Sequence, residues 1–341
     1  APSLSAIRSL ARDVAASSMS IEQNPELQGL LAYQAYQLNR EAQGNVNEPD
    51  IYNGLYAAMK KLISPAYNMY QGIRTSVKDI HYLRRTGSIL IASSDGSMKI
   101  LSGNYTSAST QINLKGTGQQ NECLLVSPDE RLAVVGTNGA GLLFLELENQ
   151  GNVVQQNAEE GTIVLFLSKL GNSGEFVSAG TDNRILKWDF QFGQAKTLLN
   201  TPDRISALSA SRNGQRLSYA TRDGKLYELE VSDPGRQQLI GDYGRVPARA
   251  IAYSPSGQTM VVGLRDGSLR VMTGIPRKNL RTLRGPGASI TDLSYSPDGK
   301  YLAASSNDGK VYLWNAENWG AQPLVFEENN GFVLSVCFSA N

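Results

Sequence analysis

Histidine and cysteine are almost absent from this chain. Its 341 residues include one histidine, His81, and two cysteines, Cys123 and Cys337. Two cysteines cannot form a disulfide framework, and metal sites usually need more ligands than these residues supply. A lone histidine could act as a general base, but no nucleophile motif such as GxSxG accompanies His81. We therefore expect His81 to be a packed or surface residue, and both cysteines to be small buried hydrophobes.

Long apolar runs and an excess of charge of either sign are also missing. No stretch approaches the roughly 18 consecutive apolar residues that a membrane helix needs. Lysine and arginine number 32 and aspartate and glutamate 31, so the net charge of +1 provides no field to attract nucleic acid or an anionic membrane. We expect a soluble domain that neither binds nucleic acid nor inserts into a membrane. Since the chain begins at Ala1, a leader or membrane tether would lie upstream of it.

The first part of the chain has the apolar spacing of helices. The stretch LSAIRSLARDVAASSM places its apolar residues at helical intervals. The stretch NPELQGLLAYQAYQLNRE begins with Asn24 in the N-cap position and Pro25 at the first helical position. A third helix is expected in IYNGLYAAMKKLI, and Pro65 ends it. The sequence thus predicts an α-helical segment over residues 1–63 and a separate domain over residues 64–341.

The second part repeats one corner at a nearly constant interval. The spacings between successive copies are 43, 44, 41, 43 and 42 residues, with the acidic or amide residue of the corner at Asp95, Asn138, Asp182, Asp223, Asp266 and Asp308. A period in the forties with several short strands in each copy is typical of a β-propeller.

Each period contains four short apolar runs separated by turns. In residues 289–326 the runs are SITDLSYS, YLAASS, VYLWN and AQPLVF, and the turns include PDGK and NDGK. Runs such as RLAVVG and TMVVGL lack a clean alternation of apolar and polar residues, which indicates sheets covered on both faces. We therefore expect an all-β propeller whose four-stranded blades pack against one another.

The repeated corner acids have two interpretations. Carboxylates repeated around a ring could line a metal site. Asp-Gly, Asn-Gly and Asp-Asn pairs also suit the centre of a type I′ hairpin, where both residues need positive φ. Because turn geometry already accounts for these residues, we expect Asp308 and the other corner acids to be structural.

The period, the Asp-Gly corner, LKWDF (186–190) and LWN (313–315) resemble the WD-repeat β-propeller family over about residues 66–341. The resemblance implies a propeller that recognises partners, although one fold hosts many functions. The chain departs from the family pattern, because no blade has the Gly-His pair and Trp closes the third strand only at Trp188 and Trp314. The family's hydrogen-bonded set of His, Ser or Thr, Trp and Asp therefore cannot be complete, and we expect packing and turn chemistry to hold the blades.

The helical stretches resemble the segment that precedes propellers in large bacterial WD-repeat proteins, both STAND-type signalling ATPases and membrane-tethered relatives. The resemblance implies that the chain is the sensor or docking end of a larger bacterial protein. No GxxxxGK[ST] loop is present in the sequence, so an ATPase part would lie outside this chain.

The number of blades is open to two interpretations. Six complete units are visible, and VLSVCFS (333–339) matches the inner-strand run ITDLSYS, as if a seventh unit began there. A propeller must close, because an open blade edge exposes unpaired backbone groups. We favour a seven-bladed ring with an incomplete last blade, to which AYNMYQ (66–71) could supply an outer strand. A six-bladed ring is the alternative.

Binding is expected at the corners and in the loops between blades. Tyrosine and arginine are the side chains most often found as interface anchors. Adjacent blades supply such residues, and we expect a patch suited to an acidic peptide or carboxylate to form from Arg204, Arg222, Tyr243, Arg245 and Arg265.

We interpret the chain as a non-catalytic protein-interaction or sensing module. It is expected to bind a protein or peptide, and to use no cofactor, no metal and no catalytic residue. The alternative is a propeller hydrolase or lactonase with a metal over the central channel. That activity would require inward carboxylates and amides from several blades around one cation.

Overall fold

The computed structural model describes residues 3–21, 25–44, 50–51, 54–55, 73, 75–102, 110–114, 118–148, 152–157, 162–191, 195–327 and 331–339. They fall into two compact units, residues 1–71 with 104–108, and residues 72–103 with 109–341. The expected N-cap Asn24, the expected boundary at residues 63 and 64, and the strand expected over 66–71 lie outside the described residues.

Among its described residues, the first unit has the helices α1 (Leu4–Met19) and α2 (Pro25–Glu41), and residues 50–51 and 54–55 are also helical. The Ser3 hydroxyl begins α1 by accepting a hydrogen bond of 3.2 Å from Ala6 N, which satisfies one otherwise free backbone donor. The helices pack through small buried side chains, notably Ala11, Ala15 and Ala35. The helical interpretation of these two stretches is confirmed.

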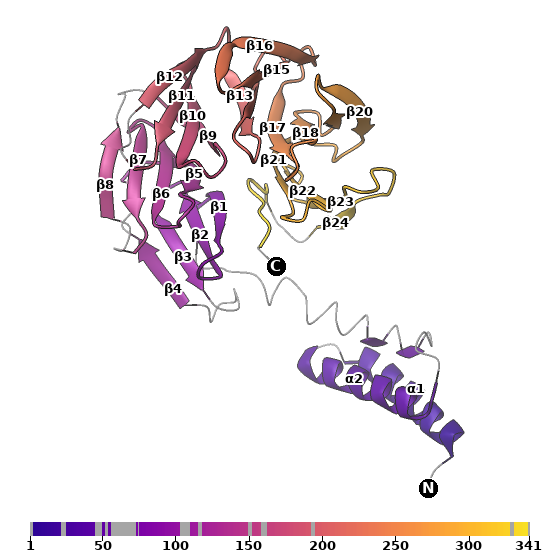
Figure 1. The fold of residues 1–341 in the computed structure, drawn as a ribbon. Coiled ribbons are helices and arrows are strands. Elements are labelled where there is room, and N and C mark those ends of the chain that lie inside the picture. The colour runs from indigo at the N-terminus through magenta and orange to yellow at the C-terminus, as the bar shows by residue number, and fades with distance from the viewer. Residues whose placement is uncertain are drawn as a thin grey trace. The chain divides into compact units, whose positions relative to one another are not determined.

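The second unit contains six antiparallel four-stranded sheets, each in simple sequence order (Figure 1). Blades 1 to 3 comprise β1 (Val77–Leu83), β2 (Ser88–Ser93), β3 (Met98–Ser102), β4 (Thr110–Leu114), β5 (Asn121–Val126), β6 (Leu132–Thr137), β7 (Leu142–Glu146), β8 (Asn152–Asn157), β9 (Val164–Lys169), β10 (Glu175–Gly180), β11 (Arg184–Asp189) and β12 (Ala195–Asn200).

Blades 4 to 6 continue the same arrangement. They comprise β13 (Ile205–Ala210), β14 (Arg216–Thr221), β15 (Lys225–Glu230), β16 (Asp233–Asp242), β17 (Ala248–Tyr253), β18 (Thr259–Leu264), β19 (Leu269–Thr273), β20 (Lys278–Leu283), β21 (Ile290–Tyr295), β22 (Tyr301–Ser306), β23 (Val311–Asn315) and β24 (Leu324–Phe326). The first strands of consecutive blades contact one another, from β1 to β21, which places them around the centre of the ring.

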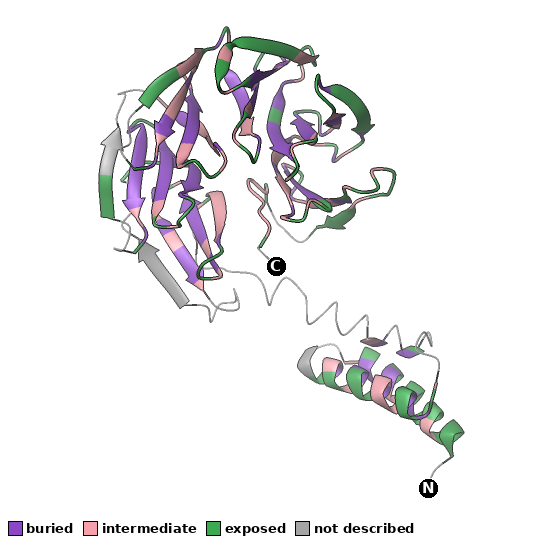
Figure 2. Ribbon diagram, viewed as in Figure 1, coloured by how far each residue is buried: buried purple, intermediate pink, exposed green. Residues whose placement is uncertain are grey.

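The hydrophobic core lies between the blades rather than within one layer (Figure 2). In β6, Ala133 and Val135 pack against blade 1, while the intervening Val134 packs against blade 3. Successive side chains of a strand point to opposite faces, so both faces of the sheet are covered. The expectation of sheets buried on both faces is confirmed, and it explains the near-continuous apolar runs.

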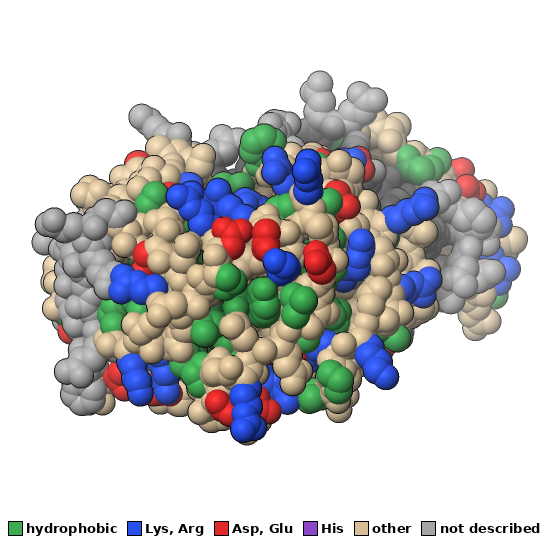
Figure 3. Space-filling view, turned by 90° about the horizontal axis from the view of Figure 1, so that it is seen from above, with side chains coloured by type: hydrophobic (Ala, Val, Ile, Leu, Met, Phe, Trp, Pro, Cys, Tyr) green, Lys and Arg blue, Asp and Glu red, His purple; other side chains and the backbone are tan. Residues whose placement is uncertain are grey.

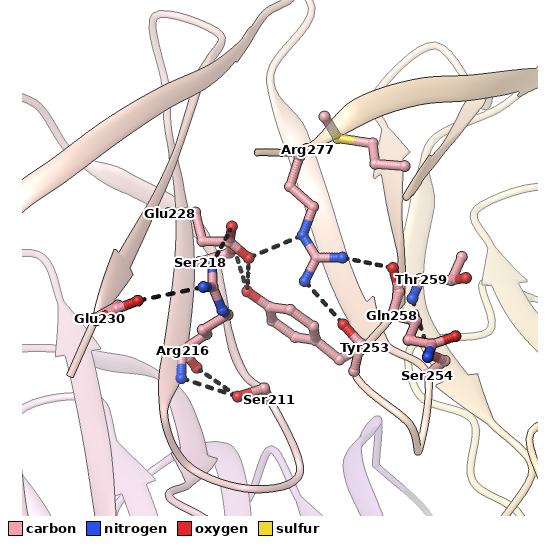
Figure 4. A network of polar contacts seen from close by, with 12 residues as sticks. Ser211, Arg216, Ser218, Glu228, Glu230, Tyr253, Ser254, Gln258, Thr259 and Arg277 are labelled. Atoms are coloured by element: carbon pink, nitrogen blue, oxygen red, sulfur yellow. Dashed lines mark hydrogen bonds and ion pairs between the residues drawn. The ribbon is translucent and has the colours of Figure 1, made fainter. Parts of the chain in front are cut away.

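A buried ion pair joins blades 4 and 5 (Figure 4). Arg277, in the turn before β20, has a fully buried side chain, and its Nε donates to Glu228 Oε1 on β15 at 3.0 Å. Tyr253 donates its hydroxyl to the same oxygen at 2.8 Å, and Arg216 reaches Oε2 at 3.2 Å. The Glu228 carboxylate is thus satisfied by three donors from two blades, which offsets the cost of burying its charge.

The corner acids form a different turn from the expected one. Positive φ is found at the glycines, for example 82° at Gly96 and 83° at Gly309, and not at the preceding aspartates. Asp308 Oδ1 accepts a hydrogen bond of 3.1 Å from the backbone N of Lys310. The type I′ prediction is wrong. The aspartate side chain accepts a hydrogen bond from the backbone N two residues later, and only the glycine has the positive φ of the left-handed region. Asp308 is nevertheless a turn-forming residue, as expected.

The structure shows six blades, so the preference for a seven-bladed ring is not confirmed. Residues 331–339, which we expected to begin a seventh inner strand, form extended chain without strand pairing. The segment lies between β21 and β1 (Figure 1). Isolated hydrogen bonds hold it to blade 6: Val333 N donates to Ser306 O at 3.2 Å, and Val336 N donates to Asp292 Oδ2 at 3.0 Å. A strand would need a continuous ladder, which these contacts do not provide.

Candidate functional site

The ring has two faces that differ in their connections. In an antiparallel meander, the turns between second and third strands lie at the same end as the loops that lead to the next blade. We call this end the corner face. The turns between first and second strands, such as residues 127–131 and 211–215, lie at the other end, which we call the turn face.

Four of the predicted arginines are exposed on the corner face of blades 4 and 5. Arg204 and Arg245 lie in the loops before β13 and β17, and Arg222 and Arg265 lie at the corners before β15 and β19. The backbone N of Arg222 donates to Arg204 O at 2.8 Å, so a corner and a loop are joined directly. The folded ring therefore brings residues from separate repeats onto one surface.

Tyr243, the fifth predicted residue, is half-buried between blades 4 and 5. Its hydroxyl donates to Met272 Sδ at 3.8 Å, and the guanidinium of Arg270 lies 5.9 Å from the centre of its ring. Burial raises the pKa of Tyr243 to about 12. The side chain contributes to packing between blades 4 and 5, and its part in binding stays a prediction.

Arg249 belongs with these arginines and was missed in the sequence. It lies on β17, is exposed to solvent, and has Arg222 and Arg265 nearby. Local desolvation, and then the charges of these two neighbours, lower the pKa of the Arg249 guanidinium. The sequence feature that could have revealed Arg249 is its charge within ARAIAY (248–253), a run whose other residues pack in the core. We call Arg204, Arg222, Arg245, Arg249 and Arg265 the arginine set.

The acidic residues near the arginine set are already occupied. Asp203 accepts from the backbone N of Arg204 at 2.7 Å and from Asp223 N at 3.2 Å. Asp223 also pairs with Lys225 at 2.7 Å, and Asp266 accepts from Ser268 N at 2.9 Å. Among the described residues, none forms an ion pair with a member of the arginine set. The guanidinium groups are thus available to an acidic ligand.

The central channel opens into a cavity of about 790 Å³ on the turn face. Its wall includes His81, Lys169, Arg84, Arg212 and several serines of the inner strands. Burial, followed by the charges of Lys169 and Arg84, lowers the pKa of His81 to about 3. His81 is therefore a neutral packed residue at neutral pH, as the sequence suggested.

Two buried carboxyl groups meet at the join between blades 6 and 1. The Ser335 hydroxyl lies 3.0 Å from Asp79 Oδ1 and 3.0 Å from Asp292 Oδ2. A hydroxyl donates only one hydrogen, so a proton on one carboxyl group is required to make both contacts hydrogen bonds. Burial, followed by the charge of Asp292, raises the pKa of Asp79 to about 7, and burial also raises the pKa of Asp292.

The remaining sequence-based candidates have simple environments. Cys123 is buried in the core between blades 2 and 3, as expected, and Cys337 is half-buried in the segment 331–339; both thiols are free. Burial raises the pKa of Cys337 to about 11. Within the described part of the chain, no group of three His, Cys, Asp or Glu side chains could hold a metal ion. The inward ligand set that the hydrolase alternative requires is not found there.

Comparison with known proteins identifies the repeat. Residues 277–315, which run from β20 through β23, match the family described as "WD domain, G-beta repeat". The chain carries a WD repeat on a β-propeller. One part of the WD-repeat hydrogen-bond set survives in blade 3, where Trp188 Nε1 donates to Ser178 Oγ at 2.7 Å. The bonded Trp–Ser pair shows that turn chemistry and packing are not the only interactions holding that blade.

Curated relatives of this WD-repeat chain share its sequence at low identity. The WD repeat-containing protein AAC3 of Dictyostelium discoideum is 27% identical over 176 residues, covering 50% of this chain and 36% of its own. Protein tipD of the same organism is 22% identical over 298 residues, covering 83% of this chain and 47% of its own. The ciliary WD repeat-containing protein ctxp80 of Euplotoides octocarinatus is 24% identical, covering 78% and 34%. The chain thus spans between about a third and a half of these relatives.

A solved structure has the same fold. A chain of "Crystal Structure of Mitotic Checkpoint Complex" aligns with a TM-score of 0.66 and 15% identity, covering 79% of this chain and 83% of that one. At this identity the likeness establishes the propeller fold alone. The relatives named above are eukaryotic, so the bacterial origin implied by the helical segment is not confirmed.

Proposed function

We propose that this WD-repeat propeller is a non-catalytic interaction or sensing module that binds an acidic protein or peptide on its corner face. The observation that carries the proposal is the arginine set. Its five exposed guanidinium groups lie on two adjacent blades and form no ion pair with a described residue, and the neighbouring carboxylates are already occupied. Arginine binds carboxylates through a planar pair of donors, which suits repeated contacts with glutamate or aspartate side chains.

The charge of the rest of the molecule makes the arginine set distinctive. The chain has a net charge of only +1, and basic and acidic side chains are interspersed on the side seen in Figure 3. An acidic ligand would therefore be attracted to a local site rather than to the whole surface. The same balance supports the prediction that the chain binds neither nucleic acid nor a membrane. None of the described helices has the length and hydropathy needed to cross a bilayer.

The relatives are consistent with a module inside a larger protein. They are WD-repeat proteins longer than this chain, and the structural neighbour belongs to a multiprotein checkpoint complex. The division into a helical segment over 1–63 and a propeller over 64–341 remains part of the proposal, as does a signalling role in a bacterial protein, which the helical resemblance alone supports.

We also infer that residues 331–339 mark the place of a seventh inner strand. Asp79 on β1 accepts a hydrogen bond from the backbone N of Leu124 on β5, at 2.8 Å. Asp292 on β21 accepts the equivalent bond from Val336 N at 3.0 Å. The segment is therefore bonded to β21 in the same way as β5 is bonded to β1. An experimental structure of the full-length protein tests this inference, and a closed six-bladed ring with 331–339 outside it would exclude a seventh blade.

Binding of a fluorescent polyglutamate peptide, measured by anisotropy, tests the proposed site. We expect Arg222→Ala/Arg249→Ala/Arg265→Ala to weaken binding at least tenfold, because each charge-assisted hydrogen bond contributes about 1.5–3 kcal/mol. The matched control is Arg131→Ala/Arg236→Ala/Arg281→Ala, which removes three exposed arginines elsewhere on the propeller. Equal loss in both variants would mean that the peptide senses net charge alone, and no loss in either would reject the site.

A further inference from the structure

Three cations gather at the turn-face end of the central channel. Arg84 directly follows β1, Lys169 is the last residue of β9, and Arg212 follows β13. Each comes after an inner strand, so the meander brings all three to the same end of the ring. They line the 790 Å³ cavity from blades 1, 3 and 4. The surface is separate from the corner face, where the arginine set lies.

None of these three cations forms an ion pair with a described residue. The ammonium group of Lys169 makes no hydrogen bond or ion pair with the described residues, and the side chain is only partly exposed. Its pKa is lowered by burial and by the charge of Arg84, against a weaker opposite effect of Glu130. Arg212 makes one long contact, 3.5 Å from Nη1 to Pro297 O. The partly buried Lys169 costs folding free energy, since a charge without an ion-pair partner loses hydration there, whereas Arg84 and Arg212 are exposed.

The carboxyl groups in the same wall do not neutralise them. Glu130 accepts from the backbone N of Arg84 at 2.7 Å and from the backbone N of Arg85 at 2.9 Å, so both of its oxygens are occupied. Asp79 and Asp292 are occupied by Ser335 and by backbone donors at the join of blades 6 and 1. In this cavity the carboxyl groups already accept hydrogen bonds, whereas the three cations form no ion pair with a described residue.

We propose that this end of the channel binds a small multivalent oxyanion, a compound with phosphate or carboxylate groups. Its charge would supply the missing partner of Lys169, Arg84 and Arg212. Two guanidinium groups and one ammonium group match such a ligand, since arginine offers paired donors and lysine a compact charge. The cavity volume lies within the range typical of small-molecule sites.

His81 provides a direct readout of this site. It is the single histidine of the chain and lines the same cavity. Its pKa is held low by burial and by the positive charges of Lys169 and Arg84. At pH 7 the ring is neutral, and an anion bound beside it changes the local electric field and so the chemical shift of its Hε1 proton. Because the chain has one imidazole, this resonance reports binding without further assignment.

The experiment follows the His81 resonance while tripolyphosphate or citrate is added at low ionic strength and about pH 7. We expect a saturable shift with at least one of them. Response to tripolyphosphate alone identifies a phosphate site, response to citrate alone a carboxylate site, and response to both a general oxyanion site. Lys169→Gln should weaken the affinity about tenfold to a hundredfold, the equivalent of losing one or two charge-assisted contacts.

Lys196→Gln, on the exposed outer strand β12, is the matched control and should leave the affinity unchanged. Arg212→Gln, an exposed position, provides a second test if Lys169→Gln does not fold. No saturable shift with either anion would overturn the proposal. Unchanged affinity in Lys169→Gln would also overturn the proposal. If that variant does not fold, unchanged affinity in Arg212→Gln has the same meaning.

Discussion

At the residue scale, charged side chains in this propeller divide into two kinds. Glu228 and Arg277 are buried and satisfied, and they tie blade 4 to blade 5. The arginine set is exposed and forms no ion pair within the part of the chain that the structure describes. A buried pair is costly to break because the remaining partner keeps its charge away from water, whereas an exposed arginine remains hydrated. Substitutions at the two kinds of site should therefore separate stability from binding.

Arg277→Ala is expected to lower the free energy of unfolding by about 3–5 kcal/mol, because Glu228 stays buried with fewer donors. The substitution also removes the bonds from Arg277 to Gly257 O and Gln258 O, at 3.0 and 2.8 Å. Urea denaturation measures the change. Arg236→Ala is the control, since its pair with Asp233 is exposed and should contribute no more than about 1 kcal/mol. Equal losses in both variants would show that the buried pair has no special role.

At the element scale, the segment 331–339 is the least regular part of the ring. It has no ladder, and Ser335 connects it to both Asp79 and Asp292. The shared proton makes this attachment sensitive to pH. Folded Asp79 has a pKa of about 7, against 3.8 for the ordinary carboxyl group. Between these values the folded state holds a proton that the unfolded chain has released, so its stability falls as pH rises.

Hydrogen exchange of residues 331–339 should therefore become faster between about pH 4 and pH 7, after correction for intrinsic exchange, because the opened segment releases the Asp79 proton that the closed segment retains. Mass spectrometry of the corresponding peptide measures this. Ser335→Ala removes the bridge and should make exchange fast at both pH values. The inner strand β13, which carries no such pair, is the internal control. A protection factor independent of pH in the wild type would contradict the shared proton.

The elements themselves were largely predictable from the sequence. The repeated corners and the apolar runs were sufficient to predict the blades, because turn chemistry and burial on both faces are local properties of each repeat. The turn type was not predicted, since Asp308 can bond its own backbone and leave positive φ to Gly309 alone. Arg249 was missed because its neighbours Arg222 and Arg265 lie at corners distant in the sequence, and only the fold brings them together.

At the scale of the whole molecule, the second unit is a ring of repeats, and we propose a different ligand for each of its two faces. The core lies between blades, so loops and corners are free to vary without loss of packing. Four of the five predicted binding residues are exposed on one face, and that placement required only the order of the strands. The number of blades was harder, because residues 331–339 have the sequence of an inner strand and lack its pairing.

The central claim is that the arginine set is the recognition surface. Phenylglyoxal modification followed by mass spectrometry, with and without a polyglutamate peptide, compares every arginine in one experiment. We predict that the peptide protects Arg204, Arg222, Arg245, Arg249 and Arg265, while Arg131, Arg236 and Arg281 react at the same rate in both samples. Protection of the second group, or no protection of the first at saturating peptide, would contradict the claim.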